Sequence, residues 1–241
     1  MANTDADGTS GKDVPTGKTV KDAPRQTRDA VATRARILTA AVKEFAKKGL
    51  TGTRIDQIAT RARCNKALIY HYFGSKEALF SAVLEKTYEN IRLAERQLDL
   101  AHKPPVEAMR ELIGFSFDYV SQHPEFIKLI NDENLHGGVH VAHSAKARDL
   151  NSPLVALIEE ILKRGEREGV FRAGVDPVQL YISIASICYF FIANRPTLSA
   201  IFGLPKTPEV LADRRRHVID VILGYLRPID GTPSISRAAN P

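Results

Sequence analysis

The sequence contains few cysteines and no long apolar run, and each shortage excludes a class of protein. Cys64 and Cys188 are its only cysteines, too few for a disulfide scaffold or a four-cysteine zinc site. Its longest apolar stretch, residues 180–193, is interrupted by serine and tyrosine and is too short to span a bilayer. The opening residues, MANTDADGTS, lack the apolar segment of a secretory signal. We therefore expect a cytoplasmic protein that makes no membrane contact.

Positive charge is concentrated at the front of the chain. Residues 1–90 contain 16 basic and 10 acidic residues, whereas residues 91–241 contain 18 of each. The net charge of +6 therefore lies entirely within the first 90 residues. This asymmetry favours a polyanion-binding front end attached to a neutral body.

Apolar residues recur at helical spacing through most of the chain, and no alternating apolar and polar runs with hairpin turns occur. We expect an all-α fold of about nine helices. The helices are predicted over residues 29–49, 53–62, 65–73, 76–100, 106–122, 124–135, 152–168, 177–201 and 208–226. Residues 1–27 are predicted to form a disordered arm and residues 229–241 a polar tail.

Two short helices joined by a tight turn, at 53–62 and 65–73, match a helix-turn-helix in length and order. Thr53 to Asp56 fits a capping box, and Asn65 fits an N-cap. On the second helix, Ile69 and Phe73 share the face expected to pack on the preceding helices. The other face is expected to enter a groove of DNA, because it combines one small residue with several hydrogen-bond donors. That face comprises Lys66, Ala67, Tyr70 and His71. The competing interpretation is an ordinary solvated surface.

The string Ile55-Asp-Gln-Ile-Ala59, followed by Leu68-Ile-Tyr-His-Tyr-Phe-Gly-Ser-Lys-Glu-Ala-Leu-Phe80, resembles the DNA-binding domain of the tetracycline-repressor (TetR) family. The resemblance implies a homodimeric regulator with a DNA-binding domain at 28–90 and an effector-binding and dimerisation domain at 91–228. It also implies contacts with double-stranded operator DNA by Thr53, Arg54, Asn65, Lys66, Ala67, Leu68, Tyr70, His71, Tyr72 and Lys76.

Two positions depart from the family pattern. Arg63 occupies the turn position where the family usually has glycine, so the residue must accept a positive φ or reshape the turn. Asn65 stands where serine or threonine is usual, and this change is mild because asparagine also caps helices well.

The C-terminal half is less specific. Residues 124–134, 164–172 and 194–202 resemble the ligand domain of a TetR subgroup similar to regulators of pyrimidine use. Aromatic and polar residues there are candidates for an effector pocket, although most of the aromatic ones could be core. The candidates are Phe115, Asp118, Tyr119, Phe126, Asn131, Asn134 and His136.

Three histidines offer a metal-binding alternative. His136, His140 and His143 would align with Glu133 on one continuous helix. Gly137 and Gly138 interrupt that helix, so we expect solvent-facing or pocket-lining histidines, with no metal site and no cofactor.

The preferred hypothesis is a repressor that a small effector releases from a palindromic operator. The alternative is a dimeric DNA-binding regulator controlled by a protein partner. An enzyme is not expected, because no catalytic motif is present. We expect the homodimer to be held by helices 177–201 and 208–226. Arginine at Ile187 or Ile222 should then give monomers or insoluble chains and abolish operator binding.

Overall fold

A computed structural model describes residues 23–229, apart from the side chains of residues 23–28, 145, 147, 148 and 150–152. This range contains eleven α-helices, one short 3-10 helix and no strand, so the predicted all-α class is confirmed. The helices are α1 (Ala23–Gly52), α2 (Ile55–Ala62), α3 (Lys66–Phe73), α4 (Lys76–Arg96), α5 (Pro105–Gln122), α6 (Pro124–Leu135), α7 (Val139–Ala142), α8 (Ala145–Arg167), α9 (Pro177–Ala193), α10 (Arg195–Phe202) and α11 (Pro208–Leu226).

The ends of the chain were predicted to be an arm and a polar tail. Most of both segments lies outside the described residues. Helix α1 begins at Ala23, so the last five residues assigned to the arm, 23–27, form the first turns of that helix. Within α1 the helical backbone is interrupted at Gly49, where φ is 69°. This is the position at which the sequence predicted the helix to close.

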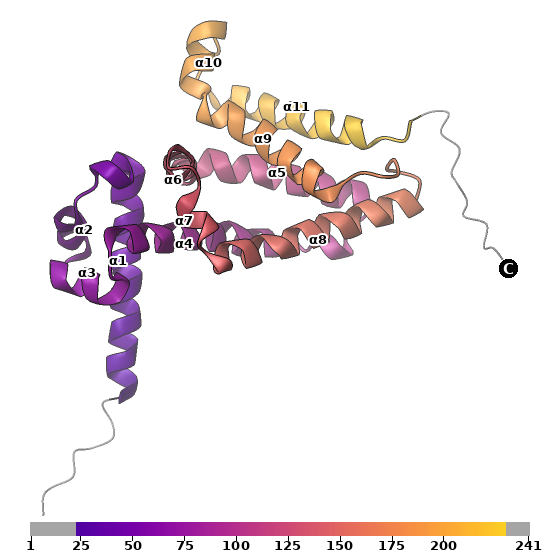
Figure 1. The fold of residues 1–241 in the computed structure, drawn as a ribbon. Helices are drawn as coiled ribbons and strands as arrows, with labels where there is room; N and C mark the ends of the chain where they lie inside the picture. Colours follow the sequence, from indigo (N-terminus) through magenta and orange to yellow (C-terminus); the bar gives the residue numbers. More distant parts are fainter. Residues whose placement is uncertain (1–22, 230–241) are drawn as a thin grey trace, which may run out of the picture.

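Helices α1 to α4 enclose the first apolar core. Phe45, Ile58, Ile69 and Phe80 are all buried in it, and the rings of Phe45 and Phe80 meet edge to face at 5.1 Å. Helices α2 and α3 lie beside α1, on the side away from the rest of the molecule (Figure 1). This packing fixes the orientation of α3, because Ile69 on its inner face is almost fully buried.

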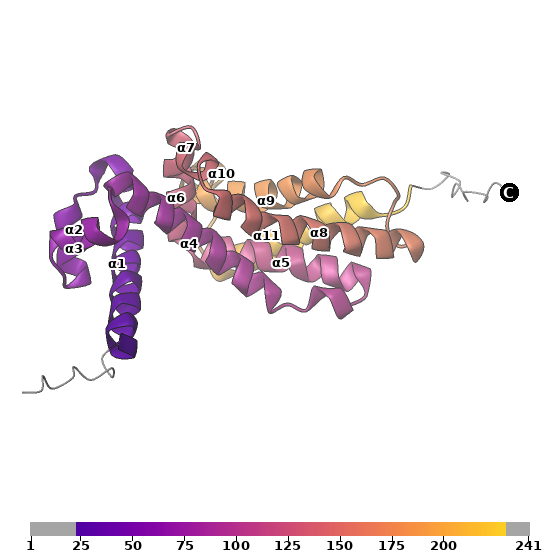
Figure 2. The same cartoon turned by 60° about the horizontal axis from the view of Figure 1, so that its bottom comes forward.

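The remaining helices form a longer bundle around a second core. Helix α4 leads from the first core into this bundle, where α5, α8, α9 and α11 run beside one another (Figures 1 and 2). Met109, Ile113, Ile158 and Val218 are fully buried there. Helix α4 belongs both to the smaller body (α1 to α4) and to the larger body (α4 to α11). Leu129 of α6 packs into the first core.

The predicted helices differ from the observed ones in several places. Helix α4 ends at Arg96 and a separate 3-10 helix covers Leu100–His102, whereas one helix was expected to reach residue 100. The segment 177–201 is two helices that meet at Asn194 with a bend of 69°, because Pro196 cannot continue the ladder of hydrogen bonds. Helix α8 begins at Ala145 and carries Pro153 inside it, whereas a start at residue 152 was expected. The glycine-histidine segment contains the short helix α7.

No single helix within residues 23–229 is long and apolar enough to cross a membrane. Only α9 and α10 taken together pass that test of length and composition, and the two are sharply bent at their junction.

Candidate nucleic-acid interface

The turn between α2 and α3 is a Schellman-type helix ending. Arg63 adopts φ 51° and ψ 50°, the left-handed conformation. Its N–H donates to the Thr60 carbonyl at 3.2 Å, and the Cys64 N–H donates to the Ala59 carbonyl at 3.0 Å. Arginine therefore takes the conformation that glycine adopts more easily, and the turn is preserved.

Asparagine at position 65 starts α3 as expected. Its side-chain oxygen accepts a hydrogen bond from the Leu68 N–H at 2.8 Å, which satisfies a donor left free at the helix start. On the inner face of α3, Ile69 is buried with Ile55 and Ile58, and Phe73 packs against the same cluster. The predicted inner face of α3 is confirmed.

The predicted capping box at Thr53 is wrong. Residue 54 is the N-cap of α2 and makes no side-chain capping bond. Thr53 is buried, and its hydroxyl donates to the carbonyls of Gly49 at 2.7 Å and Glu44 at 3.1 Å. The hydroxyl therefore closes the end of α1, and the side chain is not placed to reach a DNA phosphate.

The outer face of α3 is exposed. Lys66, Ala67, Tyr70 and His71 lie on it, and 42% of the Tyr70 surface is accessible. Lys66 forms an ion pair with Asp56 of α2 at 3.3 Å. Because both side chains are exposed, this pair is weak and a phosphate could replace the carboxylate.

The other predicted DNA contacts are distributed around this face. Arg54 and Asn65 are exposed, whereas Leu68, Tyr72 and Lys76 are half-buried. The Lys76 ammonium donates to the Thr51 carbonyl at 3.3 Å, so it is held at the start of α4. Seven of the ten predicted residues thus belong to α3 or its N-cap, Arg54 and Lys76 lie at the starts of α2 and α4, and Thr53 is buried.

Two arginines of α1 were not singled out from the sequence. Arg34 lies over the Phe73 ring at 5.0 Å, which places its charge next to the end of α3. Arg36 donates from Nε to the Ala62 carbonyl at 2.8 Å and so closes the end of α2. The concentration of basic residues in the first 90 was the only sequence signal for them.

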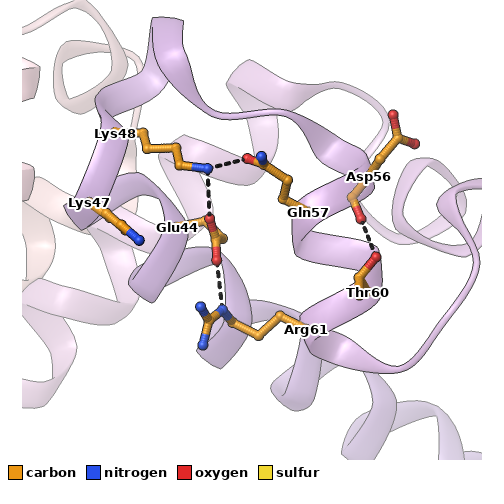
Figure 3. A pocket seen from close by; sticks show the side chains of 7 residues that line it. All are labelled: Glu44, Lys47, Lys48, Asp56, Gln57, Thr60 and Arg61. Carbon is orange, nitrogen blue, oxygen red and sulfur yellow. Dashed lines mark hydrogen bonds and ion pairs between the residues drawn. The ribbon is translucent and has the colours of Figure 1, made fainter.

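A hollow of about 500 Å³ between α1 and α2 contains the network that ties these helices together (Figure 3). Glu44 is buried and accepts a hydrogen bond from Arg61 Nε at 2.7 Å. That hydrogen bond holds the pKa of Glu44 below its ordinary value. Lys48 donates to Gln57 at 2.7 Å and lies 3.7 Å from Glu44. The network fixes α2, and through α2 the recognition helix α3.

Four of the seven candidate effector residues line a second hollow, of about 440 Å³, between α1, α4, α5 and α6. These four are Phe115, Asp118, Tyr119 and Phe126. Asp118 is already paired, since Arg215 Nε donates to both of its oxygens at 2.9 Å. The remaining three lie elsewhere: Asn131 accepts from the Tyr189 hydroxyl, Asn134 is exposed, and His136 caps the end of α6.

The three histidines do not share one helix. The chain breaks at Gly137 and Gly138, both with φ 75°, and His140 lies on α7. His140 Nδ1 is 2.7 Å from the buried carboxylate of Glu133, which also accepts the N–H groups of His140 and Val141. Among the residues whose placement is described, no group of three metal-binding side chains occurs. Glu133 thus anchors α7 to α6.

An exposed recognition helix on a helix-turn-helix scaffold, joined to a larger helical body, defines a transcriptional regulator that binds DNA. Residues 37–83 match the bacterial regulatory proteins of the tetR family, and residues 105–222 match the tetracyclin repressor-like C-terminal domain. The HTH-type transcriptional repressor NicS of Pseudomonas putida is 42% identical over 81% of this chain and 92% of its own length. The chain belongs to the TetR family.

Two further similarities span both bodies. The HTH-type transcriptional regulator RutR of Escherichia coli is 29% identical over 87% of this chain and 97% of its own length. The crystal structure of SCO4942, a transcriptional regulator from Streptomyces coelicolor, superposes with a TM-score of 0.61 at 26% identity. That match covers 80% of this chain and 98% of SCO4942.

Proposed function

We propose that the chain is a homodimeric repressor that binds a palindromic operator and is released from it by a small effector. The exposed outer face of α3 is the observation that carries the DNA-binding part of this proposal. Its side chains suit a major groove: an alanine permits close approach, and lysine, tyrosine and histidine offer donors to bases and phosphates. NicS, the 42% identical relative, is named as a repressor, which favours repression over activation.

The homodimer is supported by apolar surface on two helices of the larger body. Val178, Ile182 and Phe190 of α9 are exposed, as are Val221 and Tyr225 of α11. Helices α9 and α11 lie side by side (Figure 1), so exposed apolar side chains occur on two adjacent helices. An apolar surface of this kind favours a partner, and a two-fold operator requires a two-fold protein.

The effector is proposed to bind within the body formed by α4 to α11. A purely apolar core would favour the alternative, control by a protein partner. Instead, the second hollow and the buried polar groups next to it favour a small molecule, because ligand sites combine apolar walls with a few polar groups.

Operator binding by variants of α3 tests the DNA-binding part of this proposal. A palindromic site is first selected from random DNA with the wild-type protein. Tyr70→Ala and Lys66→Ala are expected to bind that site roughly fivefold to a hundredfold more weakly, because each removes a contact worth roughly 1–3 kcal/mol. Fluorescence anisotropy measures the affinities, and circular dichroism checks that the variants are folded.

Lys128→Ala serves as the matched control, because Lys128 is an exposed lysine on α6. Its affinity for the operator should equal that of the wild type. Unchanged affinity of both α3 variants would contradict the proposed interface, and so would an equal loss of affinity in Lys128→Ala.

A further inference from the structure

A pair of opposite charges is buried inside the larger body. Arg92 and Glu95 lie one turn apart on α4 and have only 5% and 6% of their surface exposed. Arg92 Nη1 is 2.9 Å from Glu95 Oε2. Burying two charges is costly unless they are paired and their remaining donors and acceptors are satisfied.

Glu95 leaves Arg92 incompletely satisfied. Neither Nε nor Nη1 of Arg92 donates a hydrogen bond, because the short contact with Glu95 is not aligned as one. Burial also raises the pKa of Glu95 to about 7, although Arg92 opposes this rise. Buried N–H donors of Arg92 therefore remain without an acceptor in the interior of the protein.

One aromatic ring lies near Arg92, and two more lie close by. The Tyr181 ring of α9 is 5.9 Å from the Arg92 guanidinium carbon. Tyr88 precedes Arg92 by one turn of α4, and burial is the main cause that raises its pKa to about 12. The Tyr88 ring meets the edge of Phe126 at 6.3 Å. Phe126 also lines the 440 Å³ hollow, so the aromatic cluster and the hollow share a wall.

We propose that Arg92 binds the carboxylate of a small aromatic effector whose ring lies among Tyr88, Tyr181 and Phe126. This inference rests on the proposed function, since it names the class of effector that the body takes. A guanidinium offers two parallel N–H donors, which match the two oxygens of a carboxylate. Aromatic walls favour a planar ring over an aliphatic chain, because rings pack edge to face or in offset stacks.

A purely structural ion pair is the competing explanation for the two charges. A structural pair would be expected to use the guanidinium donors, since unpaired buried donors are costly. The free Nε and the misaligned Nη1 do not fit that role. They fit a binding site in which a ligand accepts these hydrogen bonds.

The test compares three probes, which separate the effect of the carboxylate charge from the effect of the aromatic ring. Benzoate carries both features, benzamide keeps the ring without the charge, and acetate keeps the charge without the ring. The melting temperature of the full chain is measured with each probe at equal millimolar concentration. Benzoate alone should raise it, because a ligand that binds only the folded state stabilises that state. Equal effects of benzoate and benzamide, equal effects of benzoate and acetate, or no effect of benzoate would each overturn the proposal.

Variants then assign the effect to Arg92. Arg92→Met should weaken benzoate binding by roughly tenfold to a hundredfold, as expected for the loss of a charge-assisted hydrogen bond. Arg96→Met, which changes an exposed arginine one turn further along α4, should keep the wild-type response. If Arg92→Met does not fold, Arg92→Lys decides, since it keeps the charge but loses the paired donors. A wild-type benzoate affinity in the folded Arg92 variant would overturn the assignment.

Operator binding is measured separately on the wild-type protein without probe. Specific operator binding without a benzoate response contradicts this inference alone. A benzoate response without operator binding contradicts the proposed function and leaves the carboxylate site in place.

Discussion

The backbone conformation of Arg63 lowers the stability of the fold, whereas its side chain adds a positive charge to the surface. Its left-handed conformation costs roughly 1–2 kcal/mol for a residue with a Cβ atom, because Cβ approaches the following carbonyl oxygen. The side chain is exposed, so little packing compensates for this cost. The guanidinium instead adds a positive charge directly before the start of α3, where DNA is proposed to bind.

Replacing Arg63 by glycine should therefore stabilise the fold and weaken DNA binding. We expect Arg63→Gly to raise the free energy of unfolding by about 0.5–1 kcal/mol, since the greater freedom of glycine in the unfolded chain offsets part of the relieved strain. Urea denaturation measures this change. Arg63→Ala is the control, because it removes the charge and keeps Cβ. Equal unfolding free energies of the two variants would contradict the strain argument.

Individual side chains were predicted well where their partners are local. Asn65 caps α3 because its bond to Leu68 spans only three residues. Thr53 was misassigned because its hydroxyl bonds backwards to the end of α1 instead of forwards into α2. Arg92 and Glu95 were not identified, since an arginine and a glutamate at this spacing are typical of an exposed helix face. Their burial depends on helices far along the chain.

Helices α1 and α6 are joined by one carboxylate that links the larger body to the helix-turn-helix. Asp132 of α6 accepts a hydrogen bond from the Leu50 N–H at 2.6 Å. A Cβ atom at Gly49 would lie only 2.6 Å from the other Asp132 oxygen, so glycine permits this close approach. The next residue, Glu133, holds α7, whose His140 packs against Phe80 at 5.1 Å. Helix α6 is therefore tied to α1 directly and to α4 through α7.

Removing this carboxylate should loosen the junction. Asp132→Ala is expected to lower the free energy of unfolding by about 1.5–3 kcal/mol, as for the loss of a hydrogen bond to a charged group. The Leu50 amide should exchange its hydrogen faster, because local opening frees it. Hydrogen exchange and urea denaturation measure the two effects.

Asn134→Ala is the matched control for Asp132→Ala. Asn134 is exposed on the same helix, two residues further on. Its replacement should change the free energy of unfolding by no more than about 0.5 kcal/mol. The exchange rate of the Leu50 amide should stay that of the wild type. Unchanged protection of the Leu50 amide in Asp132→Ala would show that the carboxylate does not hold the junction.

Helix boundaries were predictable where a strong local signal coincides with the packing. Gly49, Asn65 and the proline starts of α5, α6 and α11 supply such signals. The break at Asn194 was missed because apolar residues resume at Leu198, although Pro196 was visible in the sequence. Helix α8 begins before the expected start at residue 152 because Pro153 lies inside a helix instead of at its first turn. Periodicity therefore identified the helices, and the packing decided where they divide.

The predicted dimer interface involves α9, which lies partly in the core and partly on the surface of the single chain. Helix α9 is apolar nearly all round, and the sequence predicted that part of it meets a partner. Its inner face, with Leu180, Ile184 and Cys188, packs into the core of one chain. Ile222 of α11 belongs to that core, and Ile187 of α9 packs against it. Arginine at Ile222 is therefore expected to give insoluble chains, one of the two predicted outcomes, so it does not test the interface alone.

The exposed face of α9 provides the correct test of the dimer. Ile182 and Phe190 have 48% and 57% of their surface accessible in the single chain, so arginine at both positions leaves the core intact. The double variant Ile182→Arg, Phe190→Arg should sediment as a monomer at micromolar concentration. Its affinity for the palindromic operator should fall by roughly a hundredfold to ten-thousandfold, because the two half-sites are no longer bound by one linked molecule.

Leu135→Arg is the control for this change, since Leu135 is an equally apolar and more exposed side chain at the end of α6. It should remain a dimer and keep its operator affinity, because Leu135 belongs to neither α9 nor α11. Analytical ultracentrifugation and anisotropy measure both proteins under one condition. A double variant that still sediments as a dimer would place the interface elsewhere. A monomer that keeps full operator affinity would show that DNA recognition does not need the two-fold protein.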